Sequence, residues 1–198
     1  MKIMKNKYIL LRHGNTIYQE EKKRFLYAIP ENDPVFLTEK GKEQVGISAE
    51  ELAGKKIDLI YSSDMARTRQ TAGIVAEKLG LKIILDKRLR DINFGIFQGG
   101  EDEKYRSFFS SKKQKLFKRP PGGESWRDVK KRVVDFLKEI DKKYSGKTIL
   151  IVSHGDPVWL MNGFIKGLSE QALLEKRRVD DPYFSFPGFY PATGEFIE

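Results

Sequence analysis

The chain of 198 residues contains only two histidines, and both stand in the same sequence context. His13 follows Arg12 after the apolar run 8–11, His154 comes shortly after the apolar run 148–152, and a glycine follows each histidine. Because imidazole titrates near neutral pH, a histidine can act as a nucleophile, a proton carrier or an anion ligand. A single such histidine is equally well explained as a hydrogen-bonded residue at a strand end. For the matched pair we favour a shared functional site.

Both apolar runs have the character of strands that are buried on two faces. Residues 14–16 (Gly, Asn and Thr) then supply the types that form turns and helix caps. In open α/β sheets, ligands bind at the edge where the strands end. Two parallel strands would therefore place Arg12, His13 and His154 side by side at that edge.

A third apolar run, 57–61, leads into a segment that is expected to begin a helix. Asp64 can cap this helix, and Gly80 ends it. The N-terminus of a helix attracts anions, because its first backbone N–H groups are unpaired and its dipole is positive there. Arg67 lies in the first turn and is expected to reach the same sheet edge, whereas Arg69 is expected to point elsewhere.

The rest of the chain alternates between helix-like and strand-like segments. An earlier helix is expected from its N-cap Thr38 to Gly54, and a third strand at 81–85. The inward positions of that helix are predicted to be Val45, Ile47, Ala49 and Leu52. Ser125 and Asp128 form a capping box before an amphipathic helix that runs to about Lys143. Pro157 suits the first turn of a helix after His154. This alternation predicts an α/β three-layer sandwich, with helices on both faces of a mostly parallel sheet.

Three segments do not fit the alternation. Residues 20–34 and 89–100 are predicted to be loops, and 101–121 a variable, partly helical insertion. The insertion carries the basic cluster Lys112, Lys113, Lys115, Lys118 and Arg119. We interpret this cluster as a solvated surface rather than as a nucleic-acid site. Near the end of the chain, Tyr183–Phe186 is expected to be at most an edge strand.

Composition restricts the possible classes of protein. A mass of 22.9 kDa suits one domain over residues 1–198. The net charge of +9 favours anionic partners without choosing among them. The absence of cysteine excludes disulfides, thiolate metal sites and a cysteine nucleophile. No apolar stretch approaches the ~20 residues of a membrane span, so we expect a soluble, cytoplasmic protein with no membrane partner.

Taken together, five motifs resemble those of the histidine phosphatase superfamily, also called phosphoglycerate mutase-like. In chain order they are Leu11–Thr16, Leu37–Gly41, Ser63–Ala72, Gly122–Ser125 and Ser153–Gly155. An Arg-His-Gly triplet alone is a weak signal, but five motifs in order on the expected elements are specific. The resemblance extends from Tyr8 to about Leu160, and it implies the phosphoglycerate mutase-like fold.

The resemblance also implies a two-step phosphoryl transfer through a phosphohistidine. His13 matches the nucleophile, and a neutral imidazole nitrogen can attack phosphorus without a metal. Arg12, Arg67 and His154 match the residues that hold the phosphoryl oxygens, where guanidinium groups suit bidentate contacts. Asn15, Gly155 and Arg24 are the further substrate-binding candidates implied by the resemblance. No cofactor and no metal are expected.

The general acid is the least defined assignment. Relatives carry glutamate in a Leu-x-Glu-x-x-x-Gly segment, and this chain offers Asp91 at that position. Asp156 and Glu101 remain alternatives, although a helix N-cap explains the first and a surface charge the second. Gln98 replaces an acidic residue that is common in the relatives. These departures leave the substrate open.

Hydrolysis of small phosphorylated substrates, with inorganic phosphate as product, is the preferred activity. A phosphoglycerate mutase must keep water away from its phosphohistidine, and this short chain has little basic character in its tail 188–198. The alternatives are a cofactor-dependent phosphoglycerate mutase and a catalytically weak module that binds a phosphate ligand or nucleic acid. Segments 20–34 and 101–121 are expected to recognise the leaving group. Oligomeric state is left open.

Overall fold

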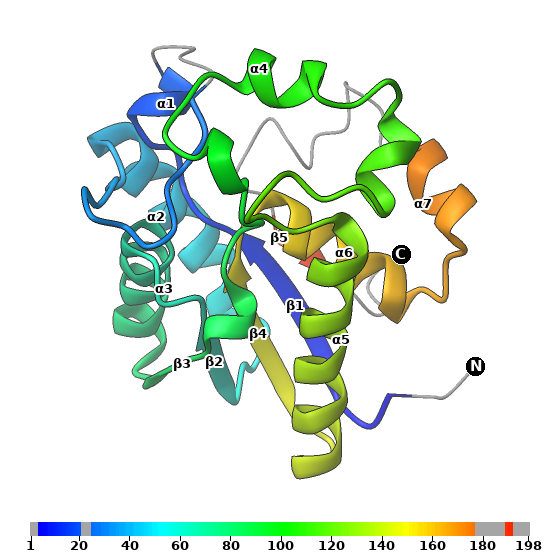
Figure 1. The fold of residues 1–198 in the computed structure, drawn as a ribbon. Helices are drawn as coiled ribbons and strands as arrows, with labels where there is room; N and C mark the ends of the chain where they lie inside the picture. The colour runs from blue at the N-terminus through cyan, green and yellow to red at the C-terminus, as the bar shows by residue number, and fades with distance from the viewer. Residues whose placement is uncertain (1–3, 21–24, 177–188, 192–198) are drawn as a thin grey trace.

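The computed structural model describes residues 4–20, 25–176 and 189–191. Its centre is a five-stranded sheet in the order β3-β2-β4-β1-β5 (Figure 1). The strands are β1 (Lys7–Arg12), β2 (Leu59–Ser62), β3 (Ile83–Leu85), β4 (Thr148–Ser153) and β5 (Phe189–Pro191). Neighbouring strands run parallel, except that β5 pairs antiparallel with β1. The predicted α/β class with a mostly parallel sheet is confirmed.

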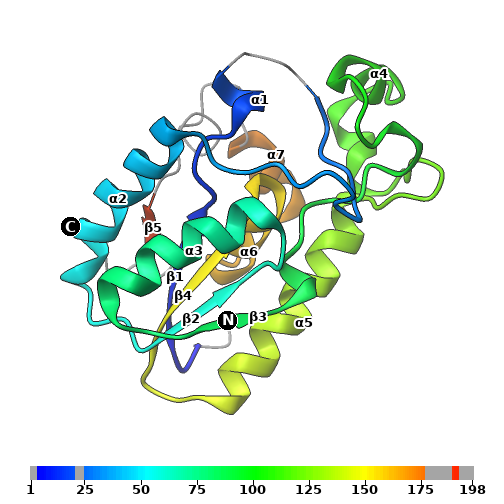
Figure 2. The same cartoon turned by 90° about the vertical axis from the view of Figure 1, so that its left-hand side faces the viewer.

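Helices cover both faces of this sheet (Figure 2). The long helices are α2 (Glu39–Ala53), α3 (Ala66–Leu79), α5 (Trp126–Lys143) and α6 (Gly155–Ile165). Because side chains alternate along a strand, Ile9 and Leu11 pack with α2 and α3, whereas Tyr8 and Leu10 pack with α5 and α6. The result is three layers with one apolar core on each side of the sheet.

The register of β1 and β4 determines where the two histidines lie. Leu11 pairs with Val152 and Arg12 with Ser153. The next step of the ladder continues past the strands, because the N–H of His13 donates to the carbonyl of Ser153 at 3.0 Å. His13 and His154 therefore leave the same edge of the sheet at the same level.

The remaining elements are short. They are α1 (Ile17–Glu20), α4 (Asp102–Ser107), α7 (Glu170–Lys176) and the 3-10 helices η1 (Lys87–Leu89), η2 (Gly95–Phe97) and η3 (Lys112–Leu116). None of the helices in the described part of the chain combines the length and apolar character that a membrane crossing requires. The predicted edge strand Tyr183–Phe186 lies outside the described residues, while β5 forms the antiparallel edge next to β1.

Two local predictions were wrong. Ile47 was expected to face inward, but 66% of it is exposed, because the buried side of α2 follows Val45, Ser48 and Leu52 at helical spacing. Asp64 was expected to cap α3, but the N-cap is Met65, whose own side chain makes no capping hydrogen bond. The carboxylate of Asp64 instead forms two hydrogen bonds of 2.6 Å with the guanidinium of Arg90.

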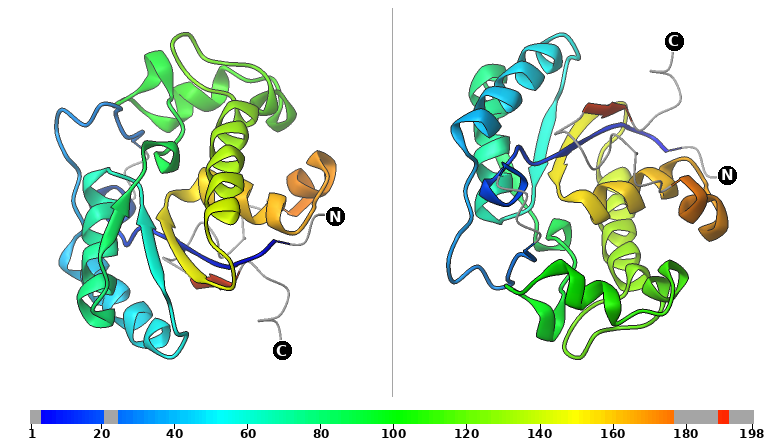
Figure 3. Two further views of the ribbon diagram at one scale, coloured as in Figure 1. Left: turned by 90° about the horizontal axis from the view of Figure 1, so that it is seen from below. Right: turned by 90° about the horizontal axis from the view of Figure 1, so that it is seen from above.

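The insertion 101–121 contributes to a small apolar cluster that is separate from the two cores on the sheet. Leu26, Tyr105 and Phe109 are its buried members, and Figure 3 shows this segment next to the N-terminal end of α5. Lys115 Nζ lies 4.6 Å from the ring centre of Tyr105, and Lys118 Nζ lies 4.0 Å from that of Phe108. These cations contact the protein's own aromatic rings. The interpretation of the basic cluster as a solvated surface rather than a nucleic-acid site stays a prediction.

Candidate active site

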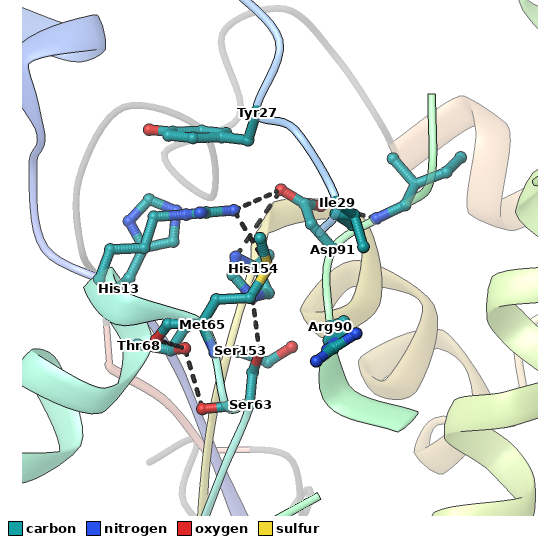
Figure 4. A network of polar contacts seen from close by, with 12 residues as sticks. His13, Tyr27, Ile29, Ser63, Met65, Thr68, Arg90, Asp91, Ser153 and His154 are labelled. Carbon is teal, nitrogen blue, oxygen red and sulfur yellow. Dashed lines mark hydrogen bonds and ion pairs between the residues drawn. The ribbon is translucent and has the colours of Figure 1, made fainter. Parts of the chain in front are cut away.

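The structure brings the two histidines together at the edge where β1 and β4 end. Their ring centres lie 5.3 Å apart, and Figure 4 shows both beside Asp91. His13 is 3% exposed and His154 is fully buried. Two residues that are far apart in the sequence thus share one desolvated site, as the matched sequence contexts predicted.

The hydrogen bonding of His13 determines which of its nitrogens is available for chemistry. Nδ1 lies 2.8 Å from the carbonyl oxygen of Gly14, and because a carbonyl can only accept, Nδ1 carries the proton. The lone pair is therefore on Nε2. Burial lowers the pKa of His13 well below its usual 6.5, and the positive charges of Arg67 and Arg12 lower it further. A neutral imidazole with an available Nε2 is the form that can attack phosphorus.

Two glycines allow the loop after His13 to lie directly against α2. A Cβ atom on Gly14 would lie 2.7 Å from the carbonyl oxygen of Gly41, and one on Gly41 would lie 2.1 Å from that of Asn15. Thr38 caps α2 by accepting from the N–H of Gly41, and its own N–H donates to Asn15 at 3.1 Å. Thr71 of α3 accepts the N–H of Gly14. The motifs 11–16 and 37–41 are therefore one structural unit.

Arg67 in the first turn of α3 is the central cation of the site. Its side chain is fully buried between two carboxylates: Nη1 lies 2.9 Å from Glu31 and Nη2 lies 3.3 Å from Asp91. The ring centre of Tyr27 lies 3.6 Å from the guanidinium carbon, and Figure 4 shows Tyr27 forming the cover of the site. A buried guanidinium that carries such partners offers fixed, directional donors to an anion.

Arg12 adds a second guanidinium at the same place. It ends β1 directly before His13. Burial lowers the pKa of Arg12, and the positive charge of Arg67 also lowers it, while the charge of Asp91 raises it. Arg12 therefore lies within electrostatic reach of both Arg67 and Asp91. An anion placed there would be stabilised by two positive charges at low effective dielectric.

Asp91 lies between Arg67 and His154. One carboxylate oxygen accepts from the N–H of Ile92 at 3.0 Å, and the other lies 3.7 Å from Nδ1 of His154. Burial raises the pKa of Asp91, although the positive charge of Arg67 opposes this. Burial thus favours the protonated carboxyl, which is the form that can donate a proton.

A side chain from α5 holds the backbone that carries Asp91. The guanidinium of Arg132 donates to the carbonyls of residues 88, 90 and 91 at 2.6 to 2.8 Å. Glu124 pairs with Arg132 at 2.9 Å and accepts from the N–H of Asn93 at 3.0 Å. Gly123 is required beside it, because a Cβ there would lie 2.7 Å from the carbonyl oxygen of Asn93. The motif 122–125 therefore positions the segment with Asp91.

His154 lies at the N-cap of α6 and its imidazole is fixed from one side. Its Nε2 lies 3.0 Å from the hydroxyl oxygen of Ser63, and its Nδ1 faces Asp91. If the hydroxyl donates to Nε2, the proton of the neutral ring is on Nδ1 and points into the site. Burial lowers the pKa of His154 well below 6.5, and Arg67 lowers it further. The ring is thus a neutral hydrogen-bond donor.

The other substrate-binding candidates differ in position. Gly155 is the first residue of α6, next to His154, where the backbone N–H groups of the helix are unpaired. Asn15 lies in the loop after His13, and its carbonyl accepts the N–H of Thr38. Arg24 lies outside the described residues.

The two alternative acids have other partners. Asp156 in the first turn of α6 accepts from the indole N–H of Trp126 at 2.9 Å. Glu101 is exposed and lies 3.6 Å from Lys104 on the surface of the insertion. The geometry therefore favours Asp91, whose carboxyl lies within the site.

Sequence reasoning missed three residues of the site: Tyr27, Glu31 and Arg132. Tyr27 and Glu31 come from the loop predicted at 20–34, where no spacing or motif indicates a contact with Arg67. Glu31 also accepts from the N–H of Ala66 at 2.7 Å. Arg132 lies on an amphipathic helix, where a partly buried arginine leaves no distinct signal. No three described His, Asp or Glu side chains are arranged to hold a metal ion.

Comparisons with known proteins agree with this geometry. The sequence model of the histidine phosphatase superfamily (branch 1) matches residues 8–180. Phosphoglycerate mutase-like protein 4 of Arabidopsis thaliana is 32% identical over 182 residues, which cover 87% of this chain and 73% of that protein. Phosphoserine phosphatase 1 of Hydrogenobacter thermophilus is 34% identical over 130 residues, covering 63% of this chain and 62% of that protein.

Similarity of structure extends further along the chain than some of the sequence matches. A mycobacterial glucosyl-3-phosphoglycerate phosphatase is 26% identical and superposes with a TM-score of 0.71, covering 86% of this chain and 84% of that one. The family model covers most of the chain. The chain belongs to the histidine phosphatase superfamily, branch 1.

Proposed function

We propose that the protein hydrolyses small phosphomonoesters in two steps through a phosphohistidine on His13. The observation that carries this proposal is the neutral His13, whose Nε2 lone pair is free while Nδ1–H is held by a carbonyl. Buried Arg67 beside it supplies the charge that a phosphoryl group needs. Relatives named as phosphatases for phosphoserine and for glucosyl-3-phosphoglycerate support a phosphoric monoester hydrolase.

In the first step, Nε2 of His13 forms a bond to phosphorus while the bond from phosphorus to the ester oxygen breaks. Asp91 donates its proton to that oxygen, so the alcohol leaves neutral and Asp91 becomes a carboxylate. The phosphorylated imidazole is positive, and the carbonyl of Gly14 stabilises it by accepting from Nδ1–H. One difficult substitution is thereby divided into two easier ones.

In the second step, a water molecule attacks the phosphohistidine. The Asp91 carboxylate accepts a proton from this water as its oxygen bonds to phosphorus, and the electron pair of the breaking P–N bond returns to Nε2. Inorganic phosphate leaves, and both His13 and Asp91 regain their starting forms. The raised pKa of Asp91 suits a group that first donates and then accepts a proton.

Arg12, Arg67 and His154 bind the phosphoryl oxygens through both steps in this proposal. Burial fixes the donors of Arg67 and His154, so these donors need not reorganise as charge shifts in the transition state. Asn15 and the N-terminal amides near Gly155 complete the phosphoryl site. In this structure the Glu31 carboxylate accepts hydrogen bonds from Nη1 of Arg67 and from the N–H of Ala66. An incoming phosphoryl group replaces the carboxylate at these two donors.

Phosphoglycerate mutase activity is the second candidate, because the Arabidopsis relative carries a mutase-like name and because His13 is almost closed to solvent. Incubation of the protein with 3-phosphoglycerate and a bisphosphoglycerate primer distinguishes the two. A hydrolase releases inorganic phosphate and forms negligible 2-phosphoglycerate. Formation of 2-phosphoglycerate faster than phosphate release would establish the mutase.

A module that binds phosphate ligands or nucleic acid without useful catalysis is the third candidate. Hydrolysis of an aryl phosphate by the wild type and by His13→Ala separates it from an enzyme, with circular dichroism to show that the variant is folded. We expect the variant to lose nearly all activity, and acid-labile label from a 32P-ester to be trapped on the wild type alone. Equal rates for the two proteins would reject the enzymatic proposal.

A further inference from the structure

A cavity of about 820 Å³ lies beside the phosphoryl site and has no assigned role. It is bounded by the segment 29–36, the N-terminal turn of α3 and the end of β3. A volume of this order is typical of sites that take small molecules. None of its lining residues comes from the insertion 101–121.

The cavity shares a wall with the proposed catalytic residues. Glu31 and Met65 line it, and both also contact the guanidinium of Arg67, through the Nη1–Oε1 pair at 2.9 Å and an Nη2–Sδ distance of 3.7 Å. Figure 4 shows Ile29 and Arg90, which also line the cavity, on either side of Asp91. Glu31 and Met65 thus form the wall between the cavity and the guanidinium of Arg67.

The lining combines apolar surface with one uncommitted cation. Phe36 and Leu85 are large apolar side chains that are 53% and 47% exposed, and both line the cavity. Arg90 is neutralised by its double contact with Asp64. Arg69 is exposed on the cavity wall, and its guanidinium forms no ion pair or hydrogen bond with the residues that the structure describes.

We propose that this cavity is the leaving-group subsite, and that it selects phosphomonoesters whose alcohol has an apolar body and ends in an anionic group bound by Arg69. The inference rests on the proposed phosphatase function. In an in-line transfer, the leaving oxygen lies opposite Nε2 of His13, next to the acid that protonates it. From Asp91, the alcohol extends past Glu31 and Met65 into the cavity, where Phe36 and Leu85 contact its apolar part.

The charge pattern determines the chemical class. Glu31 and Asp64 are the two carboxylates on the wall, and arginines engage both of them. An anionic leaving group therefore has Arg69 as a partner on this wall, since no described carboxylate pairs with its guanidinium. A carboxylate or second phosphate contacts such a guanidinium through two parallel hydrogen bonds.

The test uses two aryl phosphates that differ only at the far end of an apolar chain, where one carries a carboxylate and the other a primary amide. Wild type should favour the carboxylate by about tenfold in kcat/KM, as expected for one charge-assisted contact. Arg69→Gln should bring this ratio of kcat/KM values close to one, and the change should lie in KM rather than in kcat. Arg69→Lys should keep most of the preference for the carboxylate. Arg127→Gln is the matched control, because Arg127 on α5 pairs with Glu170 and does not line the cavity.

Binding of the same two esters to His13→Ala, measured by calorimetry with and without Arg69→Gln, gives a readout that does not depend on turnover. A preference for the carboxylate that disappears with Arg69→Gln supports the subsite, even if His13-dependent hydrolysis fails and the proposed function falls. A ratio that Arg69→Gln leaves at its wild-type value, in binding or in kcat/KM, overturns the subsite. If hydrolysis requires His13 but proceeds equally well with the carboxylate and the amide ester, the subsite proposal is rejected and the phosphatase proposal is retained.

Discussion

The two sides of the candidate site are built in different ways. The floor consists of His13 and His154, which leave adjacent parallel strands and are held in place by the backbone ladder between β1 and β4. The cover consists of Tyr27 and Glu31, which come from an irregular segment and reach Arg67 through side chains. Backbone register fixes the floor, whereas individual side-chain contacts hold the cover.

This difference separates groups that the chemistry needs from groups that the substrate can displace. The strands cannot shift by one residue without turning their side chains to the opposite face. The Glu31 carboxylate, in contrast, can be exchanged for another anion on the same donors. Substitutions in the floor should therefore lower the rate of reaction, and substitutions in the cover should change substrate binding.

The largest effect is expected for Arg67→Lys. An ammonium group cannot donate to two oxygens in the fixed geometry of a guanidinium, and the charge would move within the buried site. We expect kcat for an aryl phosphate to fall by about 10²- to 10³-fold, as for loss of a transition-state donor. Steady-state kinetics provide the measurement. An unchanged kcat would show that Arg67 serves only the fold.

Asp91→Asn sharpens the assignment of the acid. Esters with poor leaving groups should lose about 10²- to 10³-fold in kcat/KM, whereas 4-nitrophenyl phosphate, whose leaving group needs no proton, should lose far less in the first step. Because the protonated carboxyl is the active form, the wild-type rate should fall as pH rises through the raised pKa of Asp91. A pH profile that keeps this alkaline decline in Asp91→Asn would assign the proton to another group.

Arg132→Lys tests whether the segment that carries Asp91 needs its support from α5. The lysine retains the charge near Glu124 but cannot bond three carbonyls at once, so the segment carrying Asp91 should lose its position. We expect a loss of about tenfold in kcat for poor leaving groups, in line with supporting residues elsewhere. The loss should nearly vanish in the Asp91→Asn background. Additive effects of the two changes would mean that Arg132 acts independently of Asp91.

The smallest effect is expected in the cover, and it has the opposite sign. Glu31→Gln removes a carboxylate that competes with the phosphoryl group for Arg67, so KM and the inhibition constant of inorganic phosphate should fall a few-fold while kcat changes little. Glu39→Gln is the control, because Glu39 lies on the exposed face of α2, where it pairs with Lys42. A higher KM in Glu31→Gln would show that Glu31 positions Arg67 for substrate.

The same division explains what the sequence could predict. His13 and His154 were identifiable because each follows an apolar run at a strand end, and Arg67 because it lies in the first turn of the helix that follows another such run. The ends of these parallel strands meet at one edge of the sheet. Asp91 was found through the family pattern, and the burial that raises its pKa became visible only in the structure. Regular elements thus carry local signals that survive in the sequence.

The remaining contacts depend on how distant segments meet. Glu31 and Arg67 are 36 residues apart, and their pairing has no periodic signature. Asp64 illustrates the same limit, since its residue type fits a helix cap but a distant arginine, Arg90, takes its carboxylate. Ile47 was assigned to the core by its hydrophobicity, although its angular position on α2 turns it toward solvent.

The contact between Gly14 and Gly41 has a mechanical consequence. Because backbone meets backbone there with no side chain between, no rotamer change can absorb a displacement of one against the other. Any tilt at the start of α2 is passed directly to the peptide whose carbonyl holds Nδ1 of His13. The alignment of the nucleophile is thus tied to the rigid-body position of an entire helix.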